Sequence, residues 1–289
     1  MKQRTLGAAA VSAVGYGGMH LSIDGRPSAA QGIRVVQAAL DAGVTLIDTA
    51  DVYCLDQHDI GHNERLIAEA LAGWRGDRST VTVATKGGLI RPGGRWESDA
   101  RPAQLRAAAE RSLRALGVER LDLYQLHAPD PVVPFADSVG ELARLLTEGT
   151  IGALGLSNVN VAQIREAQEI APVASVQNRL NPFFREALAG GVVRYCAEQG
   201  IAFLAYSPTG GGRLTRTLPS HPVLSAVASR LGVSAHAVVL AWALAQSPTV
   251  IVIPSARVVE HALDSIGAAG LRLTPDDLSA IDGAVFSRT

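Results

Sequence analysis

Only two lysines occur in the chain, against twenty-four arginines, and one of them lies where it could do chemistry. Lys86 ends the apolar, β-branched run Val81–Thr85 and is followed by two glycines. Arg carries a permanent charge on a planar fork, whereas Lys carries a compact ammonium whose pKa its surroundings can shift. In a chain that supplies nearly every cation as Arg, Lys86 is a candidate for a chemical role, with chance as the alternative.

Two neighbouring apolar runs also end in titratable residues. Val44–Ile47 leads into Asp48, with Tyr53 five residues later, and Leu121–Leu126 leads into His127. An ammonium beside a phenol lowers the pKa of the phenol, and a carboxylate keeps the ammonium charged and in place. An imidazole can hydrogen-bond both the phenol and a substrate oxygen. If the four side chains converge, they predict a tyrosine that acts as a general acid for carbonyl reduction.

Each of these residues has a structural alternative. An Asp at a strand end often caps a helix or forms a turn, and a Tyr after a strand often only packs. A single His is more often structural than catalytic. A shared location favours the chemical interpretation.

Composition excludes several other classes of function. The chain has 289 residues, of which 47% are hydrophobic and 18% charged, with a net charge of −1 and no run of like charges. These values favour neither nucleic acid nor an anionic membrane as a partner, and no protein partner is indicated. Cys54 and Cys196 lack metal-type spacing, no GxSxG elbow occurs, and no metal site is predicted. No stretch resembles a signal peptide or a membrane span, so we expect a cytoplasmic protein with reduced thiols.

Short apolar runs alternate with amphipathic stretches along the whole chain. Helices are predicted over Ser28–Ala42 and Pro102–Leu116, from apolar residues three or four apart. Helix ends are predicted by glycines that precede strands, at Gly43, Gly117, Gly149 and Gly200. The predicted strands are Val11–Val14, Val44–Ile47, Val81–Thr85, Leu121–Leu126, Ile151–Leu156, Ala174–Val176, Ile201–Ala205 and Val250–Ile253.

Eight such repeats in this length fit an α/β fold, a (β/α)8 TIM barrel that forms one domain over residues 1–289. The strand ends then face one rim, where Asp48, Tyr53, Lys86 and His127 could meet. A doubly wound sheet is the alternative, but the segment Gly15–His20 lacks the third glycine of a dinucleotide fingerprint. The segment Gly87–Asp99 is expected to be a long loop after the third strand, on the side that carries barrel active sites.

At these residues the chain resembles the aldo-keto reductase family over nearly its whole length. The resemblance includes a short N-terminal β-hairpin and a C-terminal helix around the barrel. The segments that carry it, in family order, are Leu6–Ser22 (with VGYGGMHLS), Gly43–Tyr53 (GVTLIDTADVY), Val81–Gly88 (VTVATKGG), Ser112–Pro131 (SLRALGVERLDLYQLHAPDP), Ile151–Val159 (IGALGLSNV), Val176–Asn178 (VQN), Leu204–Pro208 (LAYSP) and Val252–Ala256 (VIPSA).

The resemblance implies NADPH bound along the C-terminal rim and a small carbonyl compound as substrate. Tyr53 would donate the proton, Lys86 and Asp48 would tune it, and His127 would orient the carbonyl. Ser157, Asn158 and Gln177 would bind the carboxamide of the nicotinamide, and Tyr206 would stack on its ring. Further cofactor contacts are implied at Gly17, Gly18, Met19, Asp48, Ser207, Pro208, Gly210, Gly211, Gly212, Ile253, Pro254, Ser255, Ala256, Arg257, His261 and Asp264.

The chain also departs from the family pattern. Positions where many members hold the 2′-phosphate of NADPH with Lys and Arg are Ser255 and His261 here, and the usual Glu-Asn pair is Asp264-Ser265. Arg257 is placed to replace the missing charge, which favours NADPH over NADH. Cys54 stands where Gly commonly follows the tyrosine, and we expect it to fill space.

Three functions remain open from the sequence. The first is an NADPH-dependent reductase of aldehydes or ketones, most like bacterial pyridoxal reductases, with His20 and Trp96 beside the substrate. The second is a regulatory NADPH-binding module like the channel-associated β subunits, against which the missing N-terminal extension argues. The third is a biosynthetic tailoring enzyme that works in the oxidative direction.

Overall fold

Eight parallel strands form the centre of the computed structural model, which describes residues 1–288. Their order in the sheet is β12-β11-β10-β9-β8-β5-β4-β3. A parallel bridge between Val14 and Val252 joins the two ends of this order and closes the barrel. The strands are β3 (Tyr16–Gly17), β4 (Leu46–Asp48), β5 (Thr82–Gly87), β8 (Leu123–Leu126), β9 (Leu154–Ser157), β10 (Ser175–Arg179), β11 (Ala202–Tyr206) and β12 (Val250–Val252).

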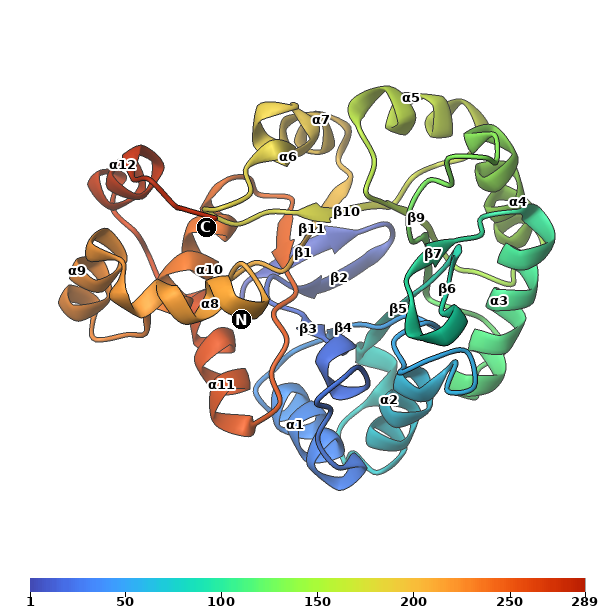
Figure 1. The fold of residues 1–289 in the computed structure, drawn as a ribbon, viewed down its shortest axis with the longest axis horizontal. Helices are drawn as coiled ribbons and strands as arrows, with labels where there is room; N and C mark the ends of the chain where they lie inside the picture. Colours follow the sequence, from blue (N-terminus) through green and yellow to red (C-terminus); the bar gives the residue numbers. More distant parts are fainter. Residues whose placement is uncertain (289) are drawn as a thin grey trace.

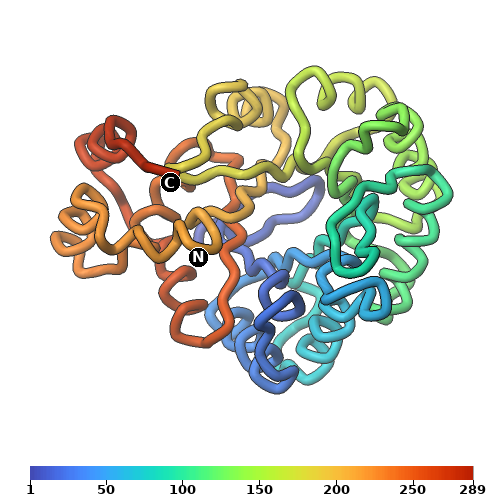
Figure 2. The backbone as a smooth tube through the Cα atoms, in the orientation of Figure 1, coloured from blue at the N-terminus to red at the C-terminus, as the bar shows by residue number. Residues whose placement is uncertain are grey.

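Helices surround this ring, so the predicted (β/α)8 barrel is confirmed (Figure 1). Figure 2 shows the backbone turning once around the barrel, from blue through green and yellow to red. The helices are α1 (Ala29–Asp41), α2 (His62–Ala72), α3 (Pro102–Leu116), α4 (Phe135–Thr147), α5 (Val161–Ile170), α6 (Glu186–Ala189), α7 (Val192–Gln199), α8 (Gly212–Thr217), α9 (Pro222–Leu231), α10 (Ala235–Ala245), α11 (Val259–Gly267) and the C-terminal α12 (Pro275–Gly283).

The N-terminal hairpin packs against one end of the barrel interior. Strands β1 (Gln3–Leu6) and β2 (Ala9–Ser12) pair antiparallel. Leu6 and Val11 belong to one buried cluster with inward residues of the barrel strands, such as Leu123 and Ile251. Figure 1 shows the hairpin crossing the ring behind the strands. The hairpin therefore covers the end of the barrel opposite the viewer.

The first predicted strand, Val11–Val14, is placed wrongly. Val11 pairs with Arg4 in the hairpin, and only Val14 reaches the barrel, at its bridge to Val252. The first barrel strand is β3 instead. Apolar side chains are buried in both settings, so hydrophobicity alone could not separate the hairpin from the barrel strand.

Helix ends agree closely with the prediction. The helix predicted over Pro102–Leu116 is α3 with the same bounds, and Ser28 caps α1 by accepting a hydrogen bond from the backbone N–H of Gln31. Gly117 and Gly200 end α3 and α7 in the left-handed conformation, with φ of 67° for both. Glycine adopts this conformation without the clash that a Cβ would cause.

The expected long loop after β5 contains structure of its own. Strands β6 (Leu89–Ile90) and β7 (Glu97–Ser98) form a small antiparallel hairpin around the 3-10 turn η3 (Pro92–Gly94). This hairpin lies at the front of the barrel in Figure 1. It places the residues between Leu89 and Ser98 over the C-terminal strand ends.

Within residues 1–288, no single helix is long and apolar enough to cross a membrane. The pair α9 and α10 reaches that length and composition together, with a bend of 95° between them.

The closure of the barrel gives a testable prediction. A Cβ added at Gly17 would lie 2.7 Å from the backbone oxygen of Ile253, which cannot move without distorting β12. We expect Gly17→Ala to lower the free energy of unfolding by about 1–3 kcal/mol, measured by denaturant titration. Gly140→Ala, inside α4 with open space around it, is the control and should raise it by about 0.5–1 kcal/mol. Equal effects of the two changes would contradict the packing argument.

Candidate active site

The ammonium of Lys86 is the centre of the site. Its Nζ donates to Asp48 Oδ1 at 2.6 Å, to the backbone oxygen of Thr49 at 2.9 Å and to the Tyr53 hydroxyl at 3.0 Å. The Lys86 side chain is fully buried. The predicted contact between these side chains is thus present in the structure.

Two adjacent strands bring these groups together. Asp48 ends β4 and lies opposite Ala84 of β5, two residues before Lys86. The backbone N–H of Thr49 donates to the oxygen of Ala84 and keeps the chain beside β5 just past the strand end. Tyr53 then returns over the rim in the loop that follows. Because the two strands are parallel and in register, the Asp48 carboxylate and the Lys86 ammonium lie at the same end of the barrel.

The pKa of Tyr53 does not shift in the predicted direction. Burial raises the pKa above 10.0 by more than Lys86 lowers it, and Asp48 raises it further. Lys86 is affected in the opposite way: burial lowers the pKa of its ammonium, but Asp48 and Tyr53 together raise it above 10.5. The pair is therefore a protonated phenol beside a charged ammonium.

His127 contacts Tyr53 through ring edges. The ring centroids are 5.8 Å apart at 80°, and the predicted hydrogen bond between the two side chains is not among those of the described residues. Burial, with a contribution from Lys86, lowers the pKa of His127 well below 6.5, so the imidazole is neutral. Its Nδ1 is buried, and it has no hydrogen-bond partner within residues 1–288.

Two buried glutamines complete the surroundings of Asp48. Oδ2 of Asp48 accepts from Gln177 Nε2 at 2.7 Å and from Gln125 Nε2 at 3.3 Å. Gln177 also donates to Gln125 Oε1 at 3.3 Å, which leaves the Gln177 oxygen as the end that a ligand could use. Gln125 was missed by the sequence reasoning, although a polar residue within the buried strand β8 was a visible signal.

Asn158 links the ends of three strands. It has a φ of 59°, which is rare for a residue with a side chain and clusters at functional sites. Its Nδ2 donates to the backbone oxygen of His127 at 3.0 Å and to Ser157 Oγ at 3.2 Å, while Oδ1 accepts from the Tyr206 hydroxyl at 2.8 Å. These predicted nicotinamide-binding residues are neighbours in the structure.

The glycine-rich loop after β11 has several residues with positive φ. Ser207 has a φ of 45°, and Gly210, Gly211 and Gly212 have φ values of 98°, 70° and 49°. The N–H of Gly210 donates to the Ser207 oxygen at 2.9 Å, so the backbone N–H groups of Gly211 and Gly212 at the start of α8 are the ones that could bind an anion. Asn181 fixes the start of the loop by donating to the Ser207 oxygen at 2.8 Å. Pro208 is buried beneath it.

The segment after β12 contributes an unpaired hydroxyl. Ser255 Oγ is buried without a hydrogen-bond partner in the described residues. Since buried polar groups normally have a partner, a bound ligand could supply the missing hydrogen bond. Its neighbours are fixed: the Pro254 oxygen accepts from the N–H of Gly17 at 2.9 Å, and the Ala256 oxygen accepts from the Tyr16 hydroxyl at 2.6 Å. The residues present thus fit a cofactor with amide and phosphate groups along this rim.

The charged residues that follow β12 differ in how firmly the structure holds them. Arg257 is exposed and spans to the loop after β3, where it donates to the backbone oxygens of His20 at 3.2 Å and Asp24 at 3.0 Å. His261 and Asp264 lie exposed on α11, and Asp264 accepts from Ser234 at 2.6 Å. Arg257 is therefore the cation at this end of the rim that the structure holds in place.

The remaining predicted residues at the mouth have separate surroundings. Trp96 stands edge-on to Tyr53, with centroids 6.4 Å apart, and to His127, at 6.5 Å. Met19 packs against the buried residues Ala50, Val52 and Tyr53.

Packing accounts for the small size of residue 18 and for Cys54. A Cβ at Gly18 would lie within 2.4 Å of the side chain of Asn63. Cys54 is fully buried, its sulfur lies 3.2 Å from the oxygens of Val52 and Asp56, and burial raises the pKa of its thiol to about 12. The expectation that Cys54 fills space agrees with this environment.

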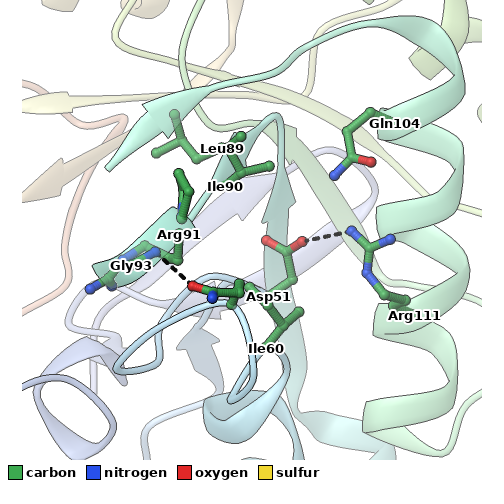
Figure 3. A pocket seen from close by; sticks show the side chains of 10 residues that line it. Asp51, Ile60, Leu89, Ile90, Arg91, Gly93, Gln104 and Arg111 are labelled. Carbon is green, nitrogen blue, oxygen red and sulfur yellow. Dashed lines mark hydrogen bonds and ion pairs between the residues drawn. The ribbon is translucent and has the colours of Figure 1, made fainter. Parts of the chain in front are cut away.

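A second buried ionisable group, Asp51, was missed by the sequence reasoning and lies in the same loop as Tyr53. Neither Asp51 oxygen has a hydrogen-bond partner in the described residues, and Oδ2 lies 3.6 Å from Arg111 Nη2 (Figure 3). Glu64 accepts from Thr85 at 2.6 Å. Asp51 and Arg111 line a cavity of about 480 Å³, whose described lining contains none of the four predicted catalytic residues.

Comparison with known proteins gives the family. Residues 13–285 match the model of the aldo/keto reductase family. The chain belongs to this family. An uncharacterized oxidoreductase of Schizosaccharomyces pombe is 35% identical over 282 residues, covering 96% of this chain and 88% of the relative. The prediction of an oxidoreductase is confirmed.

Solved structures of the family have the same fold. A glycerol dehydrogenase from Gluconobacter oxydans has a TM-score of 0.82 and 30% identity, covering 97% of this chain and 93% of its own. An aldo/keto reductase from Klebsiella pneumoniae, in complex with NADP and acetate, has a TM-score of 0.80 and 26% identity, covering 96% and 93%. Within residues 1–288, no group of three or more His, Cys, Asp or Glu is placed to hold a metal ion.

Asp51 gives a pH-dependent prediction. Burial and the nearby Glu64 outweigh Arg111 and raise the pKa of Asp51 from 3.8 to about 8. The folded protein therefore keeps a proton that the unfolded chain releases, so this carboxyl costs stability as the pH rises from about 4 to about 8. Asp51→Asn needs no proton. Its free energy of unfolding, relative to the wild type, should rise by roughly 3–4 kcal/mol between pH 5 and pH 8.

Chemical denaturation at a series of pH values measures this difference. Asp137→Asn, at an exposed position in the first turn of α4, is the control and should show no such trend. A difference between Asp51→Asn and the wild type that stays constant with pH would show that Asp51 is ionised in the folded state.

Proposed function

We propose that the chain reduces an aldehyde or ketone to an alcohol with NADPH, and that Tyr53 donates the proton. The observation that carries this proposal is the buried Lys86 ammonium in contact with both Asp48 and the Tyr53 hydroxyl. A phenol fixed beside a charged ammonium at a barrel rim has the donor and the electrostatic stabilisation that a developing alkoxide needs. Membership of the aldo/keto reductase family supports carbonyl reduction in general.

The cofactor assignment has two kinds of support. The Klebsiella pneumoniae neighbour was crystallised with NADP. In this chain, the Gln177 oxygen, the Ser157 hydroxyl and Asn158 would hold the carboxamide, and the Ser255 hydroxyl and the backbone of Gly211 and Gly212 would hold the phosphates. When bound, the cofactor supplies hydride to the carbonyl carbon. Arg257 would be the contact of the 2′-phosphate that distinguishes NADPH from NADH.

The protein's own groups control the proton. At neutral pH the raised pKa of Tyr53 keeps its hydroxyl protonated and ready to donate. As the proton leaves, the growing negative charge on the phenol oxygen lies 3.0 Å from Nζ of Lys86. The oxygens of Asp48 accept from Lys86, Gln177 and Gln125, which fixes the carboxylate beside the ammonium.

His127 would orient the substrate as a neutral group. An uncharged imidazole can donate one hydrogen bond to a carbonyl oxygen without placing a second positive charge next to Lys86. The ring edges of His127, Tyr53 and Trp96 surround the same space. These aromatic groups favour a small aromatic aldehyde, and pyridoxal is a suitable member of that class.

Oxidation of an alcohol is the second candidate. The similarity to a glycerol dehydrogenase favours it. That direction needs Tyr53 as a phenolate base, and burial opposes this form at neutral pH. Reduction is therefore the direction that we propose near pH 7. A regulatory NADPH-binding module would share the same four residues. Measuring whether the protein turns over a carbonyl substrate distinguishes the two functions.

The first functional prediction concerns Tyr53. We expect Tyr53→Phe to reduce kcat for aromatic aldehydes, pyridoxal included, by about 10²- to 10⁴-fold, because the general acid is lost. NADPH oxidation measures the rate, and cofactor titration should show unchanged binding. Tyr195→Phe removes a hydroxyl that bonds only Gln168 among the described residues and serves as the control. Full activity of Tyr53→Phe would eliminate the proposed acid.

The second concerns Arg257. Replacing Arg257 with Ala should weaken NADPH binding roughly 10-fold or more, as a lost charged hydrogen bond predicts, and leave NADH binding unchanged. Fluorescence titration with both cofactors measures this. Arg194→Ala, exposed on α7 and paired with Glu198, is the charge-matched control. If Arg257→Ala weakens both cofactors equally, Arg257 does not read the 2′-phosphate.

A further inference from the structure

Arg91 is a buried cation whose hydrogen-bonding capacity is fully used. The residue is 6% exposed, and a guanidinium presents five N–H donors. Five hydrogen bonds leave it, all to backbone oxygens. Nε donates to Gly94 at 3.2 Å, Nη1 to Val52 at 3.3 Å and Cys54 at 2.8 Å, and Nη2 to Leu55 at 2.9 Å and Gly94 at 2.8 Å.

These oxygens belong to two different loops of the active site. Val52, Cys54 and Leu55 flank Tyr53 in the loop after β4, whereas Gly94 ends the turn η3 between β6 and β7. A second bond joins the same loops, from the N–H of Gly93 to Gln57 Oε1 at 2.6 Å (Figure 3). Arg91 therefore connects the loop that carries Tyr53 to the hairpin that covers it.

The flat face of the same guanidinium supports Trp96. The guanidinium carbon lies 4.0 Å from the centroid of the indole ring. Trp96 is 46% exposed, so burial does little to fix its position, yet its edge contacts both Tyr53 and His127. The cation beneath the ring is the contact that can hold the indole in this orientation.

We propose that Arg91 is a positioning residue that fixes the Tyr53 loop and holds the Trp96 indole as a rigid wall of the substrate pocket, so that flat aromatic carbonyl compounds are preferred over flexible aliphatic ones. The inference rests on the proposed function, since it names the substrate class of that site. It adds a residue that does not touch the reacting atoms and acts through Trp96 and the Tyr53 loop.

The geometry also explains why Lys would not serve. An ammonium has three donors on one atom and no flat face, so it cannot donate to all four carbonyls of the two loops or stack flat under an indole. Arg91→Lys keeps the charge and weakens both functions. Arg91→Met keeps most of the apolar stem and removes the charge as well.

Steady-state kinetics with benzaldehyde and butanal tests the proposal. We expect Arg91→Lys, Arg91→Met and Trp96→Ala each to raise KM for benzaldehyde roughly tenfold, with little change in KM for butanal and in NADPH affinity. Since both residues act on one wall, the double variant Arg91→Met/Trp96→Ala should be no worse than either single change. Arg95→Lys and Arg95→Met, in the same turn but exposed and paired with Glu97, are the matched controls.

Two kinetic results would overturn the proposal. One is an Arg91 variant whose ratio of KM for benzaldehyde to KM for butanal equals that of the Arg95 controls. The other is a double variant whose KM effect is the product of the single effects, since the residues would then act independently. If Arg91→Met fails to fold, Arg91→Lys carries the test, because it keeps the charge and the length of the side chain.

Amide hydrogen exchange tests the connection without any turnover. Arg91→Lys should speed exchange in residues 52–57 and 92–97, and leave the strands β8 to β11 unchanged. Unchanged exchange in both loops would refute the clamp, whatever the kinetics. If the wild type reduces neither aldehyde, the proposed function is refuted. The exchange result would still decide whether Arg91 joins the two loops.

Discussion

A buried ammonium that must be neutralised organises the site. Lys86 is fully buried, and removing a charge from water costs several kcal/mol unless a close partner and further hydrogen bonds offset it. Asp48, the Thr49 oxygen and the Tyr53 hydroxyl supply these partners. The position of Tyr53 is thus fixed by the same bonds that allow Lys86 to be buried. This coupling fixes the phenol beside a positive charge, while burial raises its pKa and disfavours the phenolate.

Asp48 joins this pair to the rest of the barrel. Its carboxylate accepts from residues on three other strands, Lys86 of β5, Gln125 of β8 and Gln177 of β10. Only a closed ring of parallel strands brings side chains from so many strands to one point. The loops then add the parts that distinguish one family member from another. Here those parts include the Arg91 contacts between two loops and the exposed Trp96.

Local signals in the sequence predicted much of the fold. The bounds of α3 and the left-handed glycines after α3 and α7 follow from residue types that act over a few positions. The first barrel strand was misplaced because the hairpin and the barrel bury the same kind of apolar residue. The four candidate catalytic residues could be chosen because three follow apolar strand runs and Tyr53 lies shortly after one of them. The polar Gln125 within a buried strand was a weaker signal that was missed, and Arg91 had no such signal. Their partners are backbone atoms and side chains distant in the sequence.

The sequence by itself predicted the alternation of strands and helices and the residue types at the rim, because these depend on composition and short-range spacing, while its motifs carried the resemblance to the family. The tertiary structure decided the direction of the Tyr53 pKa, since burial opposes the effect of Lys86 and burial exists only in the folded chain. The tertiary structure also decided the different roles of Lys86 and Arg91. Lys86 lies where one small donor meets three acceptors, and Arg91 lies where five spread donors join two loops.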